Sequence, residues 1–419
     1  MLLRLIFILL MLAPTTMVGA VEIVVSEQSG ALTQALNNAK AGDIIRLQPG
    51  SYKGPIVINK AIILDGGGKA AIVGNEIGSV ISVTVPNVTV RGLTITGSGS
   101  KGNGRDAGVF LGKKAENAVV SDNKILGNLV GVDVRGSKNA LVTRNIIQGR
   151  QDHRMNDRGN GVYMWNAPGA KVIKNDFRWG RDGIFVNTSK NNEFSNNRFR
   201  DLRFAVHYMY ANNSVVSGNI SLGNHLGYAI MYSDDVRIEG NYSKGDRNHG
   251  IMMNYTNRTL VLNNHIEQVG DKCVFIYNAH RNSFKGNLFS GCGIGIHFTA
   301  GSERNDFISN AFVGNRTQVK YVGTRWIDWS VDGHGNYWSD HAAYDLDGNG
   351  IADTAYRPND IMDHVLWTQP AAKFLLGSPA IQLIRWSQSA FPALLPGGVI
   401  DQAPMMHPLL PQPPSWEEF

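Results

Sequence analysis

The stretch "GIFVNTSKNNEFSNNRFRDLRFAVHYMYANNSVVSGN", residues 183–219, contains the same pattern twice. Each copy starts at a small residue, Gly183 or Ala205, continues with alternating apolar side chains, and reaches an asparagine 14 residues later, at Asn197 or Asn219. The copies are 22 residues apart, and no helical pattern lies between them. Short β-rich runs that recur at this period indicate the coils of a solenoid.

The pattern extends well beyond these two copies. It recurs in "GVDVRG", "GVYMWN", "GIFVNT", "AVHYMY", "GYAIMY", "GIMMNY" and "CVFIYN", which start at residues 131, 161, 183, 205, 227, 250 and 273. Nine asparagines follow at spacings of 22, 30, 22, 22, 22, 23, 23 and 23, namely Asn123, Asn145, Asn175, Asn197, Asn219, Asn241, Asn264, Asn287 and Asn310. The chain is therefore predicted to be all-β, a right-handed parallel β-helix whose asparagines stack along one edge.

Successive side chains of each predicted strand point to opposite sides, so every coil has an inner and an outer face. Places one and three after the start of a coil, such as Val206 and Tyr208, are expected to fill the interior. Place two faces outward and reads Asp133, Tyr163, Phe185, His207, Ala229, Met252, Phe275 and, with a slip of one residue, His297. Place four also faces outward and reads Arg135, Trp165, Asn187, Met209, Met231, Asn254 and Tyr277.

The N-terminus resembles an export signal. Arg4, an apolar run from Leu5 to Leu12 and the small residues Val18-Gly19-Ala20 predict a signal peptide over residues 1–20. No later stretch approaches the roughly 20 apolar residues that a membrane-spanning helix needs. The mature chain is expected to be exported and soluble.

Three features interrupt the repeat. Residues 21–324 form the predicted β-helix, and an amphipathic helix within residues 30–52 is expected to cap its N-terminal end. The apolar face of that helix consists of Leu32, Ala35, Leu36 and Ala39. The coil between Asn145 and Asn175 has eight additional residues, 151–158, which are expected to form a surface loop. Residues 325–419 lose the period and are expected to be a C-terminal cap or a partner-docking region.

Charge and cysteine content exclude several classes of protein. A net charge of +6 without a basic tract indicates scattered surface charge and no nucleic-acid site. Cys273 and Cys292 are 19 residues apart, which matches no CxxC metal or redox motif. In an oxidising compartment they form one disulfide or remain two buried thiols, and the sequence leaves both states open.

The outward columns suggest a soft metal. Met209 and Met231 are expected on adjacent coils, with His207 beside them. Thioether and imidazole groups suit monovalent copper, whereas calcium or magnesium prefers carboxylates. The alternative is that outward methionines lie beneath a loop or a partner protein. The candidate copper ligands are His207, Met209, Met231, Met252, His225 and His249.

Two further motifs have competing structural explanations. The stretch "DLDGNGIAD" alternates oxygen ligands as a calcium loop does, at Asp345, Asp347, Asn349 and Asp353. The bidentate glutamate expected at the twelfth place is missing, since Tyr356 stands there, so a self-satisfied turn is the alternative. Tyr210, Tyr232 and Tyr255 recur at place five, as a sugar platform or as ordinary stacking at a strand end.

No convincing catalytic constellation stands out. Enzymes of this fold that act on acidic polysaccharides pair carboxylates with a basic residue across coils. Here only Asp133 with Arg135 and Arg181 with Asp182 are available, and isolated pairs of this kind are usually weak surface ion pairs.

The C-terminal region carries a specific resemblance. The segments "GNYWSDHAAYDLDGNGIADTAY" (335–356), "LLGSPAIQLIRWSQSAFP" (375–392) and "APMMHP" (403–408) resemble the NosD family, and the preceding repeat extends the likeness over the mature chain. This family serves the maturation of the copper sites of nitrous oxide reductase. The resemblance implies a periplasmic, non-enzymatic protein that docks on a transporter of NosF and NosY. It further implies that the protein receives copper from the chaperone NosL and engages nitrous oxide reductase.

Two functions of different classes follow. The first is copper handling and docking within an ABC-transporter complex. The second is a secreted polysaccharide lyase or epimerase. The absent carboxylate cluster and the specific tail favour the first, in which the apolar pieces of residues 371–391 pack along a membrane partner or fold back as a cap.

Overall fold

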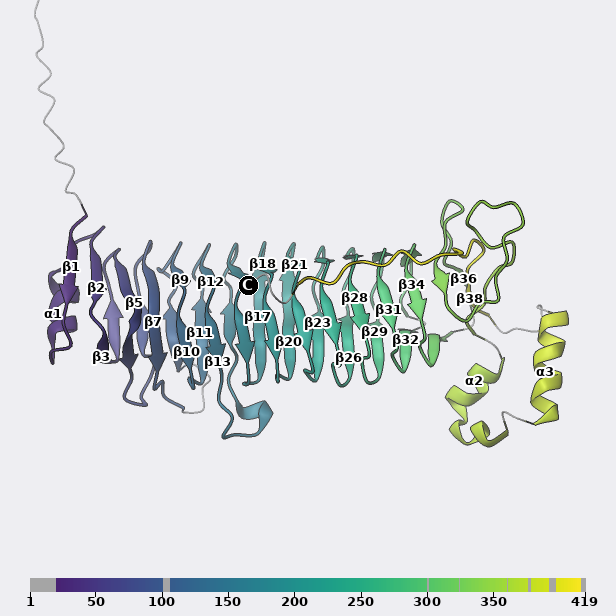
Figure 1. Cartoon of the computed structure of the whole chain (residues 1–419), viewed down its shortest axis with the longest axis horizontal. Coiled ribbons are helices and arrows are strands. Elements are labelled where there is room, and N and C mark those ends of the chain that lie inside the picture. The colour runs from purple at the N-terminus through teal and green to yellow at the C-terminus, as the bar shows by residue number, and fades with distance from the viewer. Residues whose placement is uncertain are drawn as a thin grey trace, which may run out of the picture.

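The computed structural model describes residues 20–100, 106–299, 301–323, 325–359, 361–375, 378–391 and 397–415. Apart from Ala20, the predicted signal peptide lies outside these residues. Parallel coils stack along one long axis, with α1 (Ala31–Asn38) at one end and the C-terminal helices at the other (Figure 1). The predicted parallel β-helix is confirmed.

Each coil contributes to two sheets, and the strands of both pair in parallel. The 12-stranded sheet consists of β4 (Ile56–Ile58), β6 (Ile81–Val83), β8 (Ala107–Leu111), β11 (Val130–Arg135), β14 (Val162–Trp165), β17 (Asp182–Lys190), β20 (Phe204–Asn212), β23 (Leu226–Met231), β26 (His249–Asn254), β29 (Lys272–Tyr277), β32 (Ile294–Thr299) and β35 (Thr317–Val322).

The 24-stranded sheet contains two ladders that share the long strands β5 (Ile63–Val73) and β7 (Thr89–Thr96). The first ladder adds β1 (Glu22–Val25), β2 (Ile44–Leu47), β9 (Val119–Ser121), β12 (Leu141–Thr143), β15 (Lys171–Ile173), β18 (Glu193–Ser195), β21 (Val215–Ser217), β24 (Arg237–Glu239), β27 (Leu260–Leu262), β30 (Ser283–Lys285) and β33 (Asp306–Ile308). The second ladder adds β3 (Gly50–Lys53), β10 (Lys124–Leu126), β13 (Ile146–Gln148), β16 (Asp176–Arg178), β19 (Arg198–Arg200), β22 (Ile220–Leu222), β25 (Tyr242–Lys244), β28 (His265–Glu267), β31 (Leu288–Ser290), β34 (Ala311–Val313) and β37 (Tyr337–Trp338).

The interior is filled as the alternation predicts. Places one and three are fully buried throughout the repeat, including Val206, Tyr208, Ile251 and Met253. Phenylalanines of the 24-stranded sheet stack from coil to coil, with 4.9 Å between the ring centroids of Phe177 and Phe199. Identical inward places thus form continuous apolar columns along the axis.

The predicted asparagine ladder is present at all nine positions and extends to Asn336. At Asn219, Oδ1 accepts hydrogen bonds from the backbone N–H of Asn197 at 2.9 Å and from its Nδ2 at 3.1 Å. The Nδ2 of Asn219 donates to the carbonyl of Phe194 and to Oδ1 of Asn241. Each amide therefore satisfies a backbone donor and a backbone acceptor that the turn leaves inside the protein.

Cys273 and Cys292 form a disulfide, with their Cα atoms 5.7 Å apart. Of the two states that the sequence leaves open, the bonded one is found. The bond joins the start of β29 to the turn that follows β31.

The N-terminal cap agrees with the prediction. Leu32, Ala35 and Leu36 of α1 are buried, and Ala39 follows directly after the helix with 2% exposure. Gly30 starts the helix in a left-handed conformation, with φ of 83°.

The C-terminal region closes the other end of the coil stack. β36 (Trp326–Asp328) pairs with β38 (Gly398–Ile400), and Asp401 follows with a fully buried carboxylate. Oδ2 of Asp401 accepts from the backbone N–H of Asn336 at 2.7 Å and from Nε1 of Trp338 at 2.8 Å. Asp401 therefore terminates the asparagine ladder.

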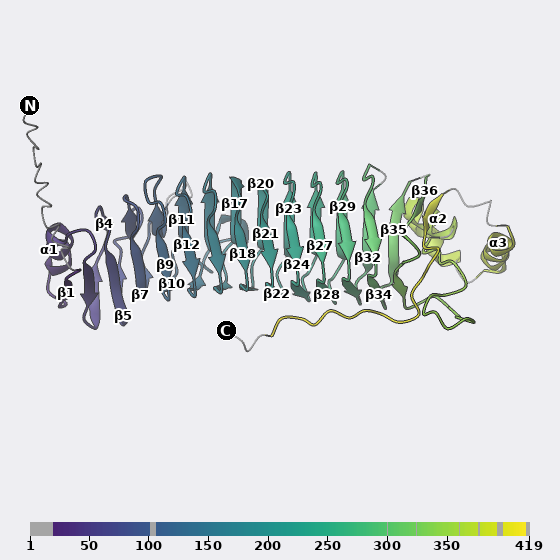
Figure 2. The same cartoon turned by 90° about the horizontal axis from the view of Figure 1, so that it is seen from above.

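The remaining elements lie outside the stack. η1 (Met155–Asp157) belongs to the predicted loop after β13, which projects from the coils (Figure 1). α2 (Ile361–Thr368), η2 (Pro370–Leu375) and α3 (Pro379–Ala390) lie beyond the last coil. The final described segment runs back alongside the coils (Figure 2). Among the described residues, no helix has the length and apolar character required to cross a membrane.

Replacement of Asn219 by alanine should lower the free energy of unfolding by about 2–4 kcal/mol, because it leaves the buried N–H of Asn197 and the carbonyl of Phe194 without partners. Chemical denaturation followed by circular dichroism measures this change. Asn37→Ala on the exposed face of α1 is the matched control. Equal stability of the two variants would contradict the assigned role of the ladder.

Asp401→Ala should loosen the C-terminal cap, since it leaves the buried N–H groups of Asn336, Trp338 and Ala403 without their acceptor. We expect a lower thermal midpoint and faster protease cleavage within residues 325–415. Asp306→Ala, which removes an exposed carboxylate from a neighbouring coil, is the control. If both variants show the same cleavage pattern, Asp401 does not hold the cap.

Candidate functional site

The outward columns form register-matched rows on the 12-stranded sheet. At place two, His207 pairs with Ala229, and Ala229 pairs with Met252. At place four, Met209 pairs with Met231. Because adjacent strands are about 4.8 Å apart, these five residues occupy one small area of the outer surface. The three methionines are half-buried.

His207 is held by a buried carboxylate on the preceding coil. Its Nδ1 lies 3.1 Å from Oδ2 of Asp182, whose side chain is fully buried. An ionised carboxylate only accepts hydrogen bonds, so Nδ1 carries a proton, and in the neutral form of the ring Nε2 has the lone pair. That Nε2 is buried and has no hydrogen-bond partner among the described residues.

Asp182 is itself fixed by Arg203, which donates from Nε at 2.7 Å and from Nη2 at 2.6 Å. Burial raises the pKa of Asp182, but the hydrogen bonds from His207 and Arg203 outweigh it and hold the pKa below its usual value. A carboxylate that orients an imidazole through Nδ1 and leaves Nε2 free is a common outer-shell arrangement at metal sites.

Ala229 is the smallest member of the place-two column and stands between His207 and Met252. Two strand spacings, about 10 Å, separate the Cα atoms of those neighbours. Since alanine ends at Cβ, the longer side chains on either side can lean toward each other above it. Met231 lies two residues farther along the same strand as Ala229.

The other two predicted histidines border this area. His249 and Phe204 occupy equivalent strand positions two coils apart, and so do Met252 and His207. The rings of Phe204 and His207 are 5.0 Å apart between centroids, so His249 and Met252 hold neighbouring places. Nδ1 of His249 is buried and has no hydrogen-bond partner in the described parts of the chain. His225 is exposed, with its ring centroid 6.4 Å from that of Phe204.

We call His207, Met209, His225, Met231, His249 and Met252 the His-Met patch. The described residues contain no group of three or more His, Cys, Asp or Glu side chains placed to hold a metal ion. A site built from carboxylates or thiolates is therefore not found there, whereas thioethers and neutral imidazoles fit monovalent copper. Copper binding by the patch stays a prediction.

Two features of this surface were missing from the sequence-based ligand set. Asp182 sits one place before its coil start and pairs in register with Phe204, but its carboxylate reaches His207 at place two of the next coil. His297 pairs with Phe275, at 5.1 Å between ring centroids, and its Nδ1 is buried without a partner among the described residues. The repeat alignment contained a signal for His297, because it placed this residue in the place-two column.

The tyrosines of place five form a stacked row. Ring centroids of Tyr210 and Tyr232 are 5.1 Å apart, as are those of Tyr232 and Tyr255. All three have positive φ, between 49° and 54°, where the strand ends. Their faces are occupied by each other, so ordinary stacking accounts for the row.

The predicted calcium loop is held by its own backbone. Asp345 accepts from the N–H groups of Gly348 and Gly350, and Asp353 accepts from that of Leu346. Asn349 bonds Asp347 and Ile351. These contacts match the alternative of a self-satisfied turn, and calcium at Asp345, Asp347, Asn349 and Asp353 stays a prediction.

The pairs considered for catalysis are engaged in ion pairs. Both carboxylate oxygens of the fully buried Asp133 accept from Nε of Arg135, at 3.1 and 2.8 Å. Asp182 bonds Arg203 and His207 as described above, and Nε of Arg181 is 3.8 Å from it. Neither carboxylate is free to act as a base in this arrangement.

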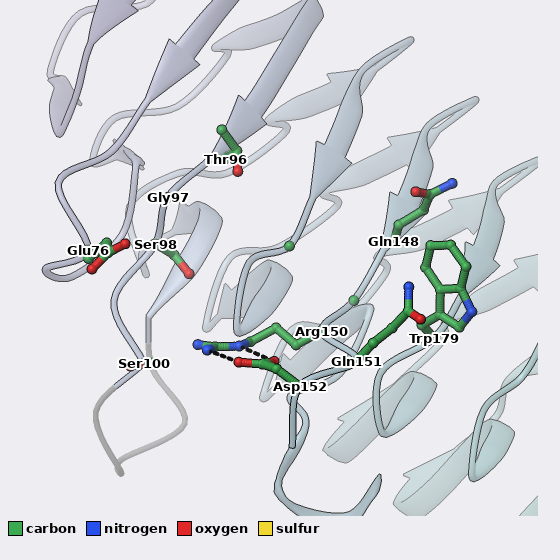
Figure 3. Close-up of a pocket in the computed structure, with 12 residues that line it drawn as sticks. Glu76, Thr96, Gly97, Ser98, Ser100, Gln148, Arg150, Gln151, Asp152 and Trp179 are labelled. Carbon is green, nitrogen blue, oxygen red and sulfur yellow. Dashed lines mark hydrogen bonds and ion pairs between the residues drawn. The ribbon is translucent and has the colours of Figure 1, made fainter. Parts of the chain in front are cut away.

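A pocket of about 570 Å³ lies where the projecting loop leaves the coils. Figure 3 shows Arg150 and Asp152 paired within it, between Glu76 on one side and Trp179 on the other. Nη2 of Arg150 lies 2.6 Å from Oδ2 of Asp152, and this ion pair lowers the pKa of Asp152. The guanidinium is thus already neutralised by its neighbour.

The C-terminal helices carry exposed apolar side chains. Leu383 and Trp386 on α3 are each 64% exposed, and Phe391 after the helix is 62% exposed. Phe374 of η2 is 83% exposed. Leu383 and Trp386 are three residues apart and so share one face of α3.

The fold places the chain among parallel β-helix proteins. A lyase from human gut microbiota, described as a mannuronic acid specific polysaccharide family 6 enzyme, superposes with a TM-score of 0.58 over 76% of this chain and 87% of its own, at 14% identity. A family 28 exopolygalacturonase of Yersinia enterocolitica gives a TM-score of 0.55 over 71% and 76%, at 11% identity. At such identities the likeness concerns the fold alone.

Sequence comparison identifies the family. Residues 144–343 match the model described as "Periplasmic copper-binding protein (NosD)". The "Probable ABC transporter binding protein NosD" of Stutzerimonas stutzeri is 40% identical over 375 residues, 86% of each chain. The protein of the same description from Pseudomonas aeruginosa is 40% identical and covers 86% of this chain and 87% of its own. The chain belongs to the NosD family.

Proposed function

We propose that the chain is the periplasmic component of an ABC-transporter complex that assists copper delivery and copper-cluster assembly in nitrous oxide reductase, and that it is not an enzyme. The observation that carries the proposal is His207, whose buried Nε2 has no hydrogen-bond partner among the described residues and whose strand also carries Met209, paired in register with Met231. The family description of relatives as copper-binding and transporter-binding proteins supports it.

In this proposal copper is cargo and the His-Met patch is where it is held. His207 supplies a lone pair that Asp182 has oriented, and Met209, Met231 and Met252 supply thioethers. His225 and His249 stand at the edge of the patch and pass the ion in or out. Thioether and neutral imidazole groups carry no charge, so they favour Cu(I) and hold it weakly enough for transfer.

Anaerobic titration of the mature protein with Cu(I) against a competing chelator tests this site. We expect the double variant His207→Ala, Met252→Ala to bind Cu(I) much more weakly, since it removes the long side chains on both sides of Ala229. Asp182→Asn should weaken it by about 10- to 100-fold through the orientation of His207.

Met155→Ala in the projecting loop is the control and should leave copper affinity unchanged. If none of the patch variants differs from that control, copper is not held there. If the unaltered protein does not bind Cu(I) at all, the patch is a contact surface and the copper role is wrong.

We also propose that the exposed face of α3 docks on the transporter. Its apolar side chains, Leu383 and Trp386, sit on an element beyond the coil stack, where a partner can reach them without disturbing the core. NosY, as the membrane subunit, is the proposed contact, with NosF as its ATPase. NosL would load copper at the patch, and nitrous oxide reductase would receive it there.

A double change, Leu383→Ser with Trp386→Ser, should abolish co-purification with NosF and NosY without lowering the thermal midpoint, because both side chains are exposed. Gln382→Ser, an exposed neighbour on the same helix, is the matched control. Retained co-purification of the double variant would show that α3 is not the docking element.

A further inference from the structure

A second pocket of about 520 Å³ lies on the outer face of the 12-stranded sheet, beneath the projecting loop. It borders the His-Met patch, because the ring centroid of Phe185 in its floor lies 4.7 Å from that of His207, but no residue of the patch lines it. Its wall is the loop of residues 151–158, and its floor is formed by β11, β14 and β17. The lining residues that matter here are Arg135, Arg158, Asn160, Tyr163, Arg181 and Phe185.

Two aromatic rings form part of the floor. Tyr163 on β14 pairs in register with Phe185 on β17, and their ring centroids are 5.5 Å apart. Both side chains are half-buried. Unlike the stacked tyrosines of place five, these rings are tilted by 47° to each other. The guanidinium of Arg135 lies 4.8 Å from the centroid of the Tyr163 ring, and that of Arg181 lies 6.0 Å from the centroid of the Phe185 ring. The two rings offer an apolar surface inside the pocket.

The pocket contains a guanidinium, that of Arg181, which is only weakly paired. Nε of Arg181 is buried and makes no hydrogen bond among the described residues. Its nearest carboxylate oxygen is Oδ2 of Asp182 at 3.8 Å, and that oxygen already accepts from Arg203 at 2.6 Å and contacts His207 at 3.1 Å. Arg181 is therefore poorly compensated.

The other lining charges do not supply the missing anion. Arg135 is neutralised by Asp133, and Arg158 donates to the neutral carbonyls of His153 and Gln151. Asp157 is the one carboxylate among the described lining residues, against three arginines. The pocket thus favours a negatively charged ligand.

Asn160 adds an unused acceptor. The residue is 8% exposed, lines the pocket, and its Oδ1 has no hydrogen-bond partner in the part of the chain that the structure describes. Buried amide oxygens are nearly always paired, so this oxygen is available to a group that donates a hydrogen bond. A ligand that carries a donor as well as an anion would use both features.

We propose that this pocket binds a uronate unit of an acidic oligosaccharide. The carboxylate would pair with Arg181, as guanidinium groups recognise carboxylates well. A ring hydroxyl would donate to Oδ1 of Asn160, and the C–H face of the sugar would lie on Tyr163 and Phe185. An acidic peptide side chain supplies the carboxylate but not a pyranose ring that bears hydroxyl donors, and the volume suits a small ligand.

The test uses the mature chain and three probes: a hexuronate trisaccharide, the neutral hexose trisaccharide of the same linkage, and tetraglutamate. Titration calorimetry measures each affinity. We expect the uronate to bind and the neutral sugar not to. Arg181→Gln should weaken uronate binding at least tenfold, and Tyr163→Leu should also weaken it while leaving every charge in place.

Arg178→Gln is the control, because Arg178 pairs with Asp201 and stacks on Trp179 outside this pocket. It should bind the uronate as the unaltered protein does. Equal binding of charged and neutral sugars, or no uronate binding, would overturn the proposal. So would tighter, Arg181-dependent binding of tetraglutamate, which would assign the pocket to a peptide.

Discussion

The hydrogen bonds of the stacked asparagines set the register of the whole molecule. Each side chain accepts from the backbone and side chain of the preceding asparagine and donates to the next, so every coil is fixed relative to both neighbours. The long coil obeys the same rule. Although 30 residues separate Asn145 from Asn175, the backbone of Asn145 reaches Oδ1 of Asn175 at 3.0 Å. The additional residues of this coil form a loop outside the stack, and the asparagine ladder continues without interruption.

Because the register is fixed, particular side chains of successive coils lie side by side on the outer face. Place two of one coil lies beside place two of the next. A substitution at this place therefore affects the surface of its own coil and of the coils on both sides. Ala229 creates room between His207 and Met252, and Asp182 orients an imidazole that belongs to another coil. Neither effect belongs to one residue. Both arise because parallel pairing brings equivalent places of successive coils together.

The projecting loop and the C-terminal end contribute features that the repeat does not contain. The projecting loop covers part of the outer sheet and creates the two pockets with different electrostatics, one with a neutralised arginine, Arg150, and one with a poorly compensated arginine, Arg181. At the C-terminal end, Asp401 offers the acceptor that the last asparagine needs. The helices beyond the last coil bury Met362 and Ile381 and present other apolar side chains outward.

The sequence by itself determined the coil period, the inward columns, the asparagine ladder and the family, because each depends on a pattern that repeats along the chain. It also placed the His-Met patch on one face. Only the tertiary structure decided that Cys273 and Cys292 are bonded, that Asp182 holds His207, and that Asp401 ends the ladder. These contacts join residues 19, 25 and 65 positions apart, and one partner in each, namely Cys292, Asp182 or Asp401, stands outside the repeat pattern. Their partners depend on how loops and turns fold over the coils, which periodicity does not encode.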